Sequence, residues 1–144
     1  MTPPGPPPPP PSSLTAVNPE SLGAPRGYSH GMLAPAGGRL LFVAGQIAWD
    51  RDGRLVAGDF AGQFGRALEN VVAVVRAAGG GPEHLARLTL YVTDRRDYQA
   101  SLPAVGEAYR RVMGSHYPAM ALLEVQGLLE PGAKVEIEAT AVLP

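Results

Sequence analysis

Two glutamates near the C-terminus have the type and spacing for proton-transfer chemistry. The segment KVEIEATAV, residues 134–142, alternates strictly, which predicts a strand with Glu136 and Glu138 on one face and Val135 and Ile137 on the other. A partly buried carboxylate on such a face can serve as a general acid or base. The structural alternative is that both are polar residues satisfied by water or by Lys134, and the residues alone leave this open.

The other candidate chemistries are sparse. His30, His84 and His116 are far apart and lack the spacing of a metal site, so we expect no metal. The chain has no cysteine, which excludes disulfides, thiolate nucleophiles and Cys-bound metals. No glycine-rich dinucleotide fingerprint precedes a helix, so we expect no cofactor. His116 adjoins the segment YPAM and is a reserve candidate for an acid or base.

Strand signals occupy the first half of the chain. RLLFVAGQIAW, residues 39–49, is rich in β-branched and aromatic residues and predicts a strand. The turn DRDG, residues 50–53, leads to an expected second strand around residues 54–57, so the pair should form a hairpin. The preceding segment YSHGMLAP is either a further strand or an extended arm.

Two helices are expected between the strands. From Asp59 onward, apolar residues recur at helical spacing as far as Val75, and the glycines at 79–81 should end this helix. For the second helix we prefer Ser101 over Asp97 as the N-cap, because the proline that follows is tolerated only in the first turn. Its apolar stripe comprises Leu102, Val105, Tyr109 and Val112.

Later strands complete an α+β fold. Strands are predicted at residues 86–94, 119–128 and 134–142, and right-handed crossovers place both helices on one face of a mixed sheet. The other face should mix polar residues with Met120 and Leu122. A half-apolar open face of this kind usually marks an assembly surface.

Composition limits the class of protein. The 144 residues are 45% hydrophobic and 17% charged, which suits one globular domain, expected over residues 14–144 after a disordered Pro-rich tail at residues 1–13. The 12 basic and 13 acidic residues are spread along the chain, so nucleic-acid binding is not expected. No long apolar run or secretory signal is present, which predicts no membrane partner and a cytoplasmic location.

With these residues placed, the chain resembles the RidA family, also called YjgF, of reactive-intermediate imine deaminases. The resemblance covers residues 28–142 through the ordered segments YSHG, LLFVAGQI, GDF with its following Gln, ALENVVAVVRAAG, YVTDRRDY, YPA and VEIEATAV. It implies a chorismate-mutase-like α+β fold. It also implies a homotrimer whose sheets pack into a central barrel, with a small-molecule pocket at each subunit interface.

The resemblance also implies site residues. In active members an arginine follows the proline-alanine pair and clamps the substrate's carboxylate, a helix asparagine precedes an aromatic, and the first glutamate of the VEIEA segment orients water. The predicted substrate-binding residues are therefore Tyr28, Gly45, Met120, Gly106 and Tyr109, and the predicted catalytic residue is Glu136. Met120 stands where active members have the arginine, and Gly106 replaces the asparagine.

Met120 determines whether the deaminase activity of the family can be expected of this chain. It offers no charge and no donor to a carboxylate, so Met120 would leave a buried anion unpaired. Either the ligand is less polar, or an arginine from elsewhere reaches the pocket, with Arg26, Arg95 and Arg96 as candidates. Whether the chain is an enzyme therefore stays open. It would be a deaminase of the 2-iminobutanoate/2-iminopropanoate type that hydrolyses an imine or enamine to a ketone and ammonia, or else a non-enzymatic trimer that binds a metabolite or a partner. A ribonuclease role has no support from charge or motifs.

Overall fold

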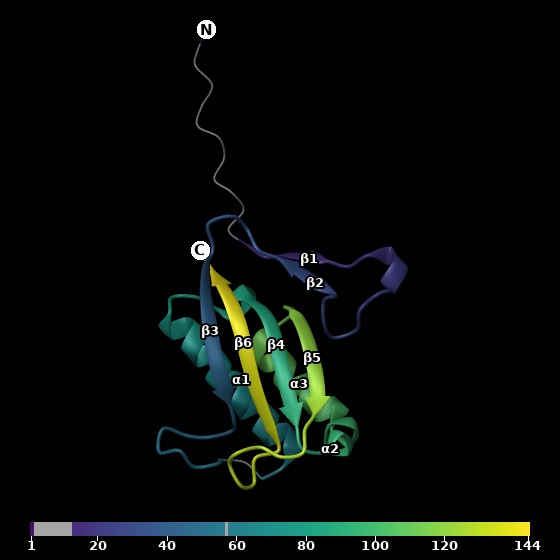
Figure 1. Cartoon of the computed structure of the whole chain (residues 1–144), viewed down its shortest axis with the longest axis vertical. Helices are drawn as coiled ribbons and strands as arrows, with labels where there is room; N and C mark the ends of the chain where they lie inside the picture. Colours follow the sequence, from purple (N-terminus) through teal and green to yellow (C-terminus); the bar gives the residue numbers. More distant parts are fainter. Residues whose placement is uncertain (2–12, 57) are drawn as a thin grey trace.

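A four-stranded mixed sheet forms one layer of the protein. The computed structural model describes residue 1, residues 13–56 and residues 58–144. The strands are β3 (Arg39–Gln46), β4 (Leu85–Val92), β5 (Ala119–Glu124) and β6 (Val135–Leu143). Their order is β3-β6-β4-β5, with β4 and β5 parallel and the other pairs antiparallel (Figure 1). The tail expected at residues 1–13 falls largely on residues 2–12, which lie outside the described residues.

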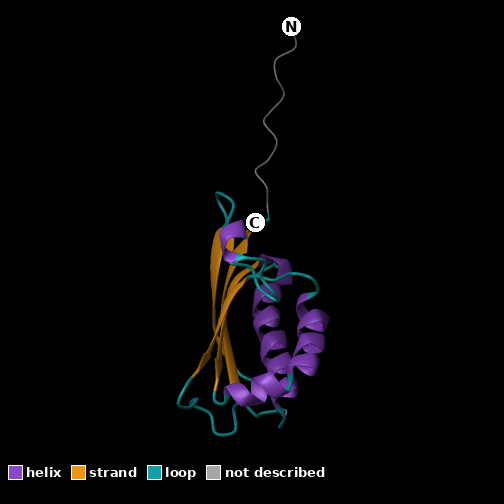
Figure 2. Ribbon diagram, turned by 90° about the vertical axis from the view of Figure 1, so that its right-hand side faces the viewer, coloured by secondary structure: helices purple, strands orange, loops and turns teal. Residues whose placement is uncertain are grey.

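Helices cover one face of this sheet and leave the other uncovered (Figure 2). They are α1 (Phe60–Ala77), α2 (Arg95–Ala100) and α3 (Leu102–Met113), with single 3-10 turns at Glu20–Leu22 and Pro82–His84. The expected α+β fold with its helices on one face is confirmed. No helix in the described part of the chain has the length and hydrophobicity needed to span a bilayer.

The short helix α2 was not predicted. The side chain of Asp94 accepts a hydrogen bond from the backbone N–H of Arg96, which caps α2 at its N-terminus. Ser101 then ends α2 and begins α3, but its side chain makes no capping hydrogen bond. The preference for Ser101 was therefore right about where α3 begins and wrong about a side-chain cap.

The core lies between the sheet and the helices. Alternate residues of β4 and β6 point into it, as the sequence pattern predicts, and Leu88, Val92, Val135 and Ile137 are almost fully buried. They pack against α1, whose apolar side is also buried. A fully buried side chain of this size contributes about 1.5–3 kcal/mol to folding.

Met120 and Leu122 point to the helix-covered face of the sheet. The prediction that placed them on the open face was therefore wrong. Met120 is registered with Leu88, and Leu122 with Leu90. Neighbouring registered residues point to the same side of a sheet, and Leu88 and Leu90 are core residues. Of β5, it is Ala119, Ala121 and Leu123 that face the open side.

The open face is nevertheless half apolar, as expected. Leu40 is 62% exposed, Phe42 74% and Leu123 44%, and they share this face with Tyr91 and Glu138. Contiguous apolar side chains of this size on an exposed sheet usually mark an interaction surface.

The expected hairpin turn is present, but the described residues of the segment 54–57 form no regular second strand, and residue 57 lies outside the described residues. Strand β3 ends at Gln46, and beyond it the chain turns back with a Trp49–Leu55 bridge and with backbone hydrogen bonds from Asp50 N–H to the Arg54 carbonyl and from Val56 N–H to the Ala48 carbonyl. Between them Asp50 accepts backbone hydrogen bonds from Asp52 and Arg54, which lowers the pKa of its carboxyl group. These side-chain bonds stabilise the turn at residues 50–54. Strand β5 likewise ends earlier than predicted, at Glu124 instead of residue 128.

Before β3 the chain forms an arm, residues 13–38. Its strands β1 (Thr15–Val17) and β2 (Gly31–Leu33) pair antiparallel beyond the end of the sheet where β5 begins (Figure 1). The arm reaches β5 through Ser29, whose backbone N–H donates to the Pro118 carbonyl at 3.1 Å and whose hydroxyl donates to the Tyr117 carbonyl at 2.6 Å. These bonds hold the neighbouring Tyr28 beside the first residues of β5.

Candidate functional site

A cavity of about 360 Å³ lies between α3 and the β5 side of the sheet. Tyr28, Gly106, Tyr109 and Met120 line it, so the structure brings together four of the five predicted substrate-binding residues. They come from the arm, from α3 and from β5, which explains why they are far apart in the sequence. The fifth, Gly45, lies elsewhere.

The inner wall of the cavity is apolar. It consists of core side chains from α1, β4 and β6: Phe64, Leu68, Leu88, Leu90 and Ile137. A cavity with such a wall favours a ligand that has an apolar part, since burying that part removes it from water.

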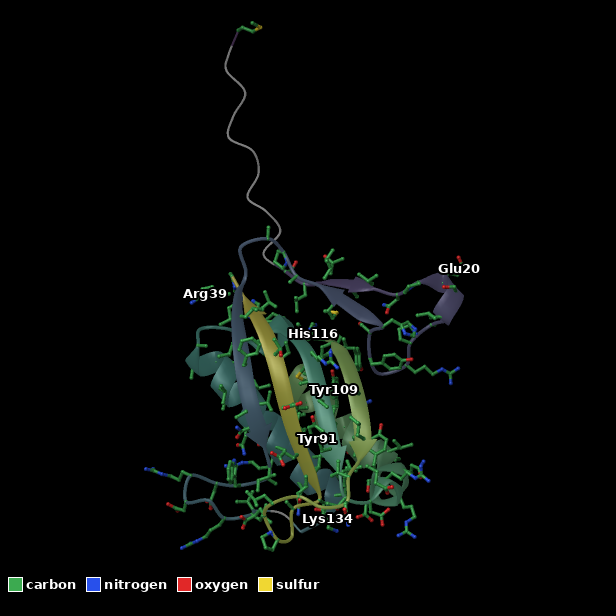
Figure 3. The ribbon with its side chains drawn as sticks, in the orientation of Figure 1. Glu20, Arg39, Tyr91, Tyr109, His116 and Lys134 are labelled. Atoms are coloured by element: carbon green, nitrogen blue, oxygen red, sulfur yellow. The ribbon has the colours of Figure 1, made fainter. Side chains whose placement is uncertain are left out.

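Tyr109 is a fixed wall residue. Its hydroxyl donates a hydrogen bond to the His116 carbonyl at 2.7 Å, and its ring stacks on Tyr117 with 5.1 Å between the centroids (Figure 3 labels Tyr109 and His116). Burial raises the pKa of Tyr109, so its hydroxyl stays neutral and is unsuited to act as a base near neutral pH.

Two arginines line the cavity along with Met120. Arg26, one of the three candidates from the sequence, comes from the arm, and Arg110 comes from α3. Arg95 and Arg96 line a different groove beside Glu124 and Asp94. Of the three arginines considered as replacements, Arg26 is thus the one at this cavity, and the sequence analysis did not consider Arg110.

The alternative candidate Arg96 is already paired. Its guanidinium binds the Asp94 carboxylate at 2.8 Å, and this hydrogen bond lowers the pKa of Asp94 to about 2 and raises that of Arg96. Among the described residues, neither Arg26 nor Arg110 has a carboxylate within ion-pair distance. Their charges are therefore the ones near the cavity that an anionic ligand could use.

Glu136 and Gly45 lie together, but on the open face. Strand β3 has a bulge between Val43 and Gln46 where it pairs with β6. A Cβ atom added at Gly45 would lie 2.9 Å from Cδ of Glu136 and closer still to Oε1, so the glycine gives the carboxylate its space. Because Glu136 alternates with core residues of β6, it points away from the side of the sheet that carries Met120.

Glu138, the neighbouring carboxylate on that face, has a partner. The Tyr91 hydroxyl donates to its Oε1 at 2.6 Å, and this bond raises the pKa of Tyr91. Figure 3 labels Tyr91. A carboxylate held in this way is less free to bind a water molecule than one without a protein donor. This distinction favours Glu136 over Glu138 as the reactive group.

The histidines are engaged with backbone atoms. His116 Nε2 lies 2.7 Å from the Leu85 carbonyl oxygen, and His30 Nε2 lies 3.1 Å from that of Gly23. His84 Nδ1 accepts from the Gly81 N–H at 3.0 Å. In the part of the chain that the structure describes, no three His, Cys, Asp or Glu residues are grouped to hold a metal ion.

The sequence, and the fold with a mixed sheet and helices on one face, match known proteins. The family model described as Endoribonuclease L-PSP matches residues 19–143. Protein DfrA of Myxococcus xanthus is 37% identical over 116 residues, which is 80% of this chain and 84% of that protein. The human 2-iminobutanoate/2-iminopropanoate deaminase is 32% identical over 129 residues, 89% of this chain and 86% of the enzyme.

A solved structure agrees with the same assignment. YyfB from Yersinia pestis, a protein of unknown function in the conserved Rid protein family, superposes with a TM-score of 0.81 at 36% identity, over 91% of this chain and 99% of that one. The chain therefore belongs to the Endoribonuclease L-PSP family, known as the RidA or YjgF family, which confirms the resemblance inferred from its sequence.

Proposed function

We propose that the protein binds a small organic ligand in the cavity beneath β5 and hydrolyses its imine or enamine group. The observation that carries the proposal is the cavity itself, which Tyr28, Gly106, Tyr109 and Met120 line together with an apolar wall. Two guanidinium groups, which have no carboxylate partner among the described residues, also line it. A relative of 32% identity bears the name of such a deaminase, which supports the reaction class.

Hydrolysis of an imine needs a positioned water molecule and little else. Water adds to the carbon of C=N to give a carbinolamine, and this intermediate collapses to a ketone and ammonia with proton transfer between oxygen and nitrogen. Glu136 accepts a hydrogen bond from the water, orients its lone pair towards the carbon and receives the proton. The same carboxylate then returns a proton to the departing amine.

A homotrimer completes this site in our proposal. Glu136 and Met120 lie on opposite faces of one sheet, so the carboxylate of one copy reaches a cavity only if subunits meet edge to face. The exposed Phe42 and Leu40 supply apolar surface for such a contact. Light scattering should give three times the chain mass, and Phe42→Glu should lower it; a monomeric native protein would refute the assembly.

The activity is tested by ammonia release from imines generated in situ from a panel of amino acids. Native protein should release ammonia, and Glu136→Gln should reduce the rate by about a hundred- to ten-thousandfold, the usual range of a general acid-base contribution. Glu138→Gln is the matched control, since it alters the next carboxylate on the same face. Equal rates for native protein and Glu136→Gln would remove Glu136 from the mechanism.

A non-enzymatic binding protein is the second candidate function. The observation that favours it is Met120, a side chain without charge or donor at the position of the family's clamping arginine. Under this hypothesis native protein releases no ammonia from any imine, while Met120→Arg gains the activity. The same panel of assays therefore separates the two functions.

A further inference from the structure

The guanidinium group of Arg110 on helix α3 lies at the cavity, in space that is free because residue 106 is a glycine. Arg110 folds back over Gly106, one turn earlier in the helix, and both residues line the cavity. A Cβ atom added at Gly106 would lie 3.3 Å from Nη1 of Arg110 and 3.9 Å from its Cζ and Nη2. All the atoms nearest this position belong to the guanidinium, so the glycine lets the charged group lie close against the helix.

The charge of Arg110 is not neutralised by an ion pair within residues 13–56 and 58–144. Its neighbour Arg111 binds Oε1 of Glu69 on α1 at 3.1 Å, whereas among the described residues Arg110 has no carboxylate partner. An arginine placed beside an apolar cavity without a protein anion provides paired donors for an anionic group on a ligand.

We propose that Arg110 binds the carboxylate of the ligand, and that the ligand is a monocarboxylic acid with an apolar body that fills the inner part of the cavity. The inference rests on the proposed function, and in that context the substrate is the imine of an apolar amino acid. The acidic group lies at the mouth near Arg110, while the body contacts the sulfur of Met120 and the core side chains beyond it.

The other arginines near the cavity are less suited to this role. Arg26 also lines the mouth and is exposed, as Arg110 is, but it comes from the arm, and among the described residues no ion pair holds its guanidinium. Arg87 lines a separate hollow of about 330 Å³ at the start of β5, which Tyr28 and Met120 also border. Of the three, Arg110 alone projects from α3, and Gly106 in the same helix leaves space for its guanidinium.

The experiment measures binding of phenylpyruvate and of phenylpyruvamide, its uncharged amide, by titration calorimetry. These stable ketones have the shape of the imine and do not react further. Native protein should prefer the acid over the amide, and Arg110→Gln should weaken acid binding by about ten- to a hundredfold while leaving amide binding unchanged. Arg111→Gln, the adjacent arginine paired with Glu69, is the matched control and should bind both as the native protein does.

A second variant tests whether the space at Gly106 positions the Arg110 guanidinium. Gly106→Ala places a methyl group against the guanidinium, so it should weaken acid binding in the same direction as Arg110→Gln, and the double variant should be no weaker than Arg110→Gln alone. Pyruvate, which lacks the apolar body, should bind more weakly than phenylpyruvate. Equal acid affinity in native protein and Arg110→Gln, or a loss that appears in Arg87→Gln instead, would overturn the inference.

Failure of this inference is distinguishable from failure of the proposed function. Acid binding that depends on Arg110 without ammonia release from any imine supports the inference and refutes the hydrolysis. Ammonia release that depends on Glu136 but is the same in Arg110→Gln for every acidic imine supports the hydrolysis and refutes the inference.

Discussion

Replacing Gly45 by alanine tests whether the absence of a side chain at the bulge in β3 is needed to accommodate the side chain of Glu136. Gly45 does not have a positive φ angle, so alanine can adopt its backbone conformation. The added Cβ would however lie 2.9 Å from Cδ and 3.0 Å from Cγ of Glu136, too close for the side chain to remain where it is. The substitution therefore forces the carboxylate to move or the strands to separate.

The expected effect follows from two opposing contributions. Overpacking of this kind costs about 1–3 kcal/mol, and replacing glycine by alanine gains about 0.4–1 kcal/mol by restricting the unfolded chain. Gly45→Ala should thus destabilise the native protein by roughly 1 kcal/mol. In a Glu136→Ala background the clash is absent and only the gain remains, so the coupling energy should be about 1–3 kcal/mol.

The assay is urea unfolding of the four proteins of this double-mutant cycle at one fixed protein concentration, because assembly makes stability concentration-dependent. Glu136→Gln is the control: it removes the charge but keeps the volume, so it should not relieve the clash of Gly45→Ala. Additive effects within about 0.5 kcal/mol would refute the steric explanation, and relief by Glu136→Gln would show that charge and not volume is responsible.

Three further predictions concern the fold around the site. Leu68→Ala should lower the free energy of unfolding by about 2–5 kcal/mol, because Leu68 is fully buried, whereas Leu102→Ala, at a half-exposed position, should cost well under half as much in the same urea titration. Gln63→Leu should cost about 2–4 kcal/mol, because it removes two side-chain hydrogen bonds to the backbone of the β5–β6 loop; a loss equal to that of an exposed residue would contradict this. The pKa of Asp94 is lowered from 3.8 to about 2, so the stability that its ionised form gains from Arg96 is present above its unfolded pKa and is lost as the pH falls through its folded one. The melting-temperature difference between native protein and Asp94→Asn should therefore be constant above about pH 5 and vanish towards pH 2; a difference independent of pH would argue against the ion pair.

Periodicity was sufficient to predict the main elements. The alternation that includes Val135 and Ile137 identified both faces of β6, and the helical spacing after Asp59 identified α1. The face of Met120 could not be predicted in the same way, because its segment is short and its orientation follows from parallel pairing with Leu88, a contact between distant residues. Local pattern carries no information on such a register.

Only part of the candidate site could be predicted, because the rest again depends on contacts that a local sequence pattern does not reveal. The resemblance identified Tyr28, Gly106, Tyr109 and Met120, and the structure places them around one cavity. It gave no reason to choose Arg110, whose position depends on the space that a glycine leaves one turn earlier. The spacing of four residues between a helical glycine and an arginine was the available signal, and by itself it is too common to be informative.

The inner wall of the cavity is at the same time the hydrophobic core, since Leu68, Leu88 and Ile137 belong to both. Any change that widens this wall for a bulkier molecule also removes contacts that keep the chain folded, so selectivity and stability trade off at these positions. The mouth, built from the arm and from the exposed side of α3, is free of that conflict. Substitutions that distinguish relatives should therefore accumulate at the mouth and be rare in the inner wall. Engineered changes of ligand selectivity should follow the same pattern.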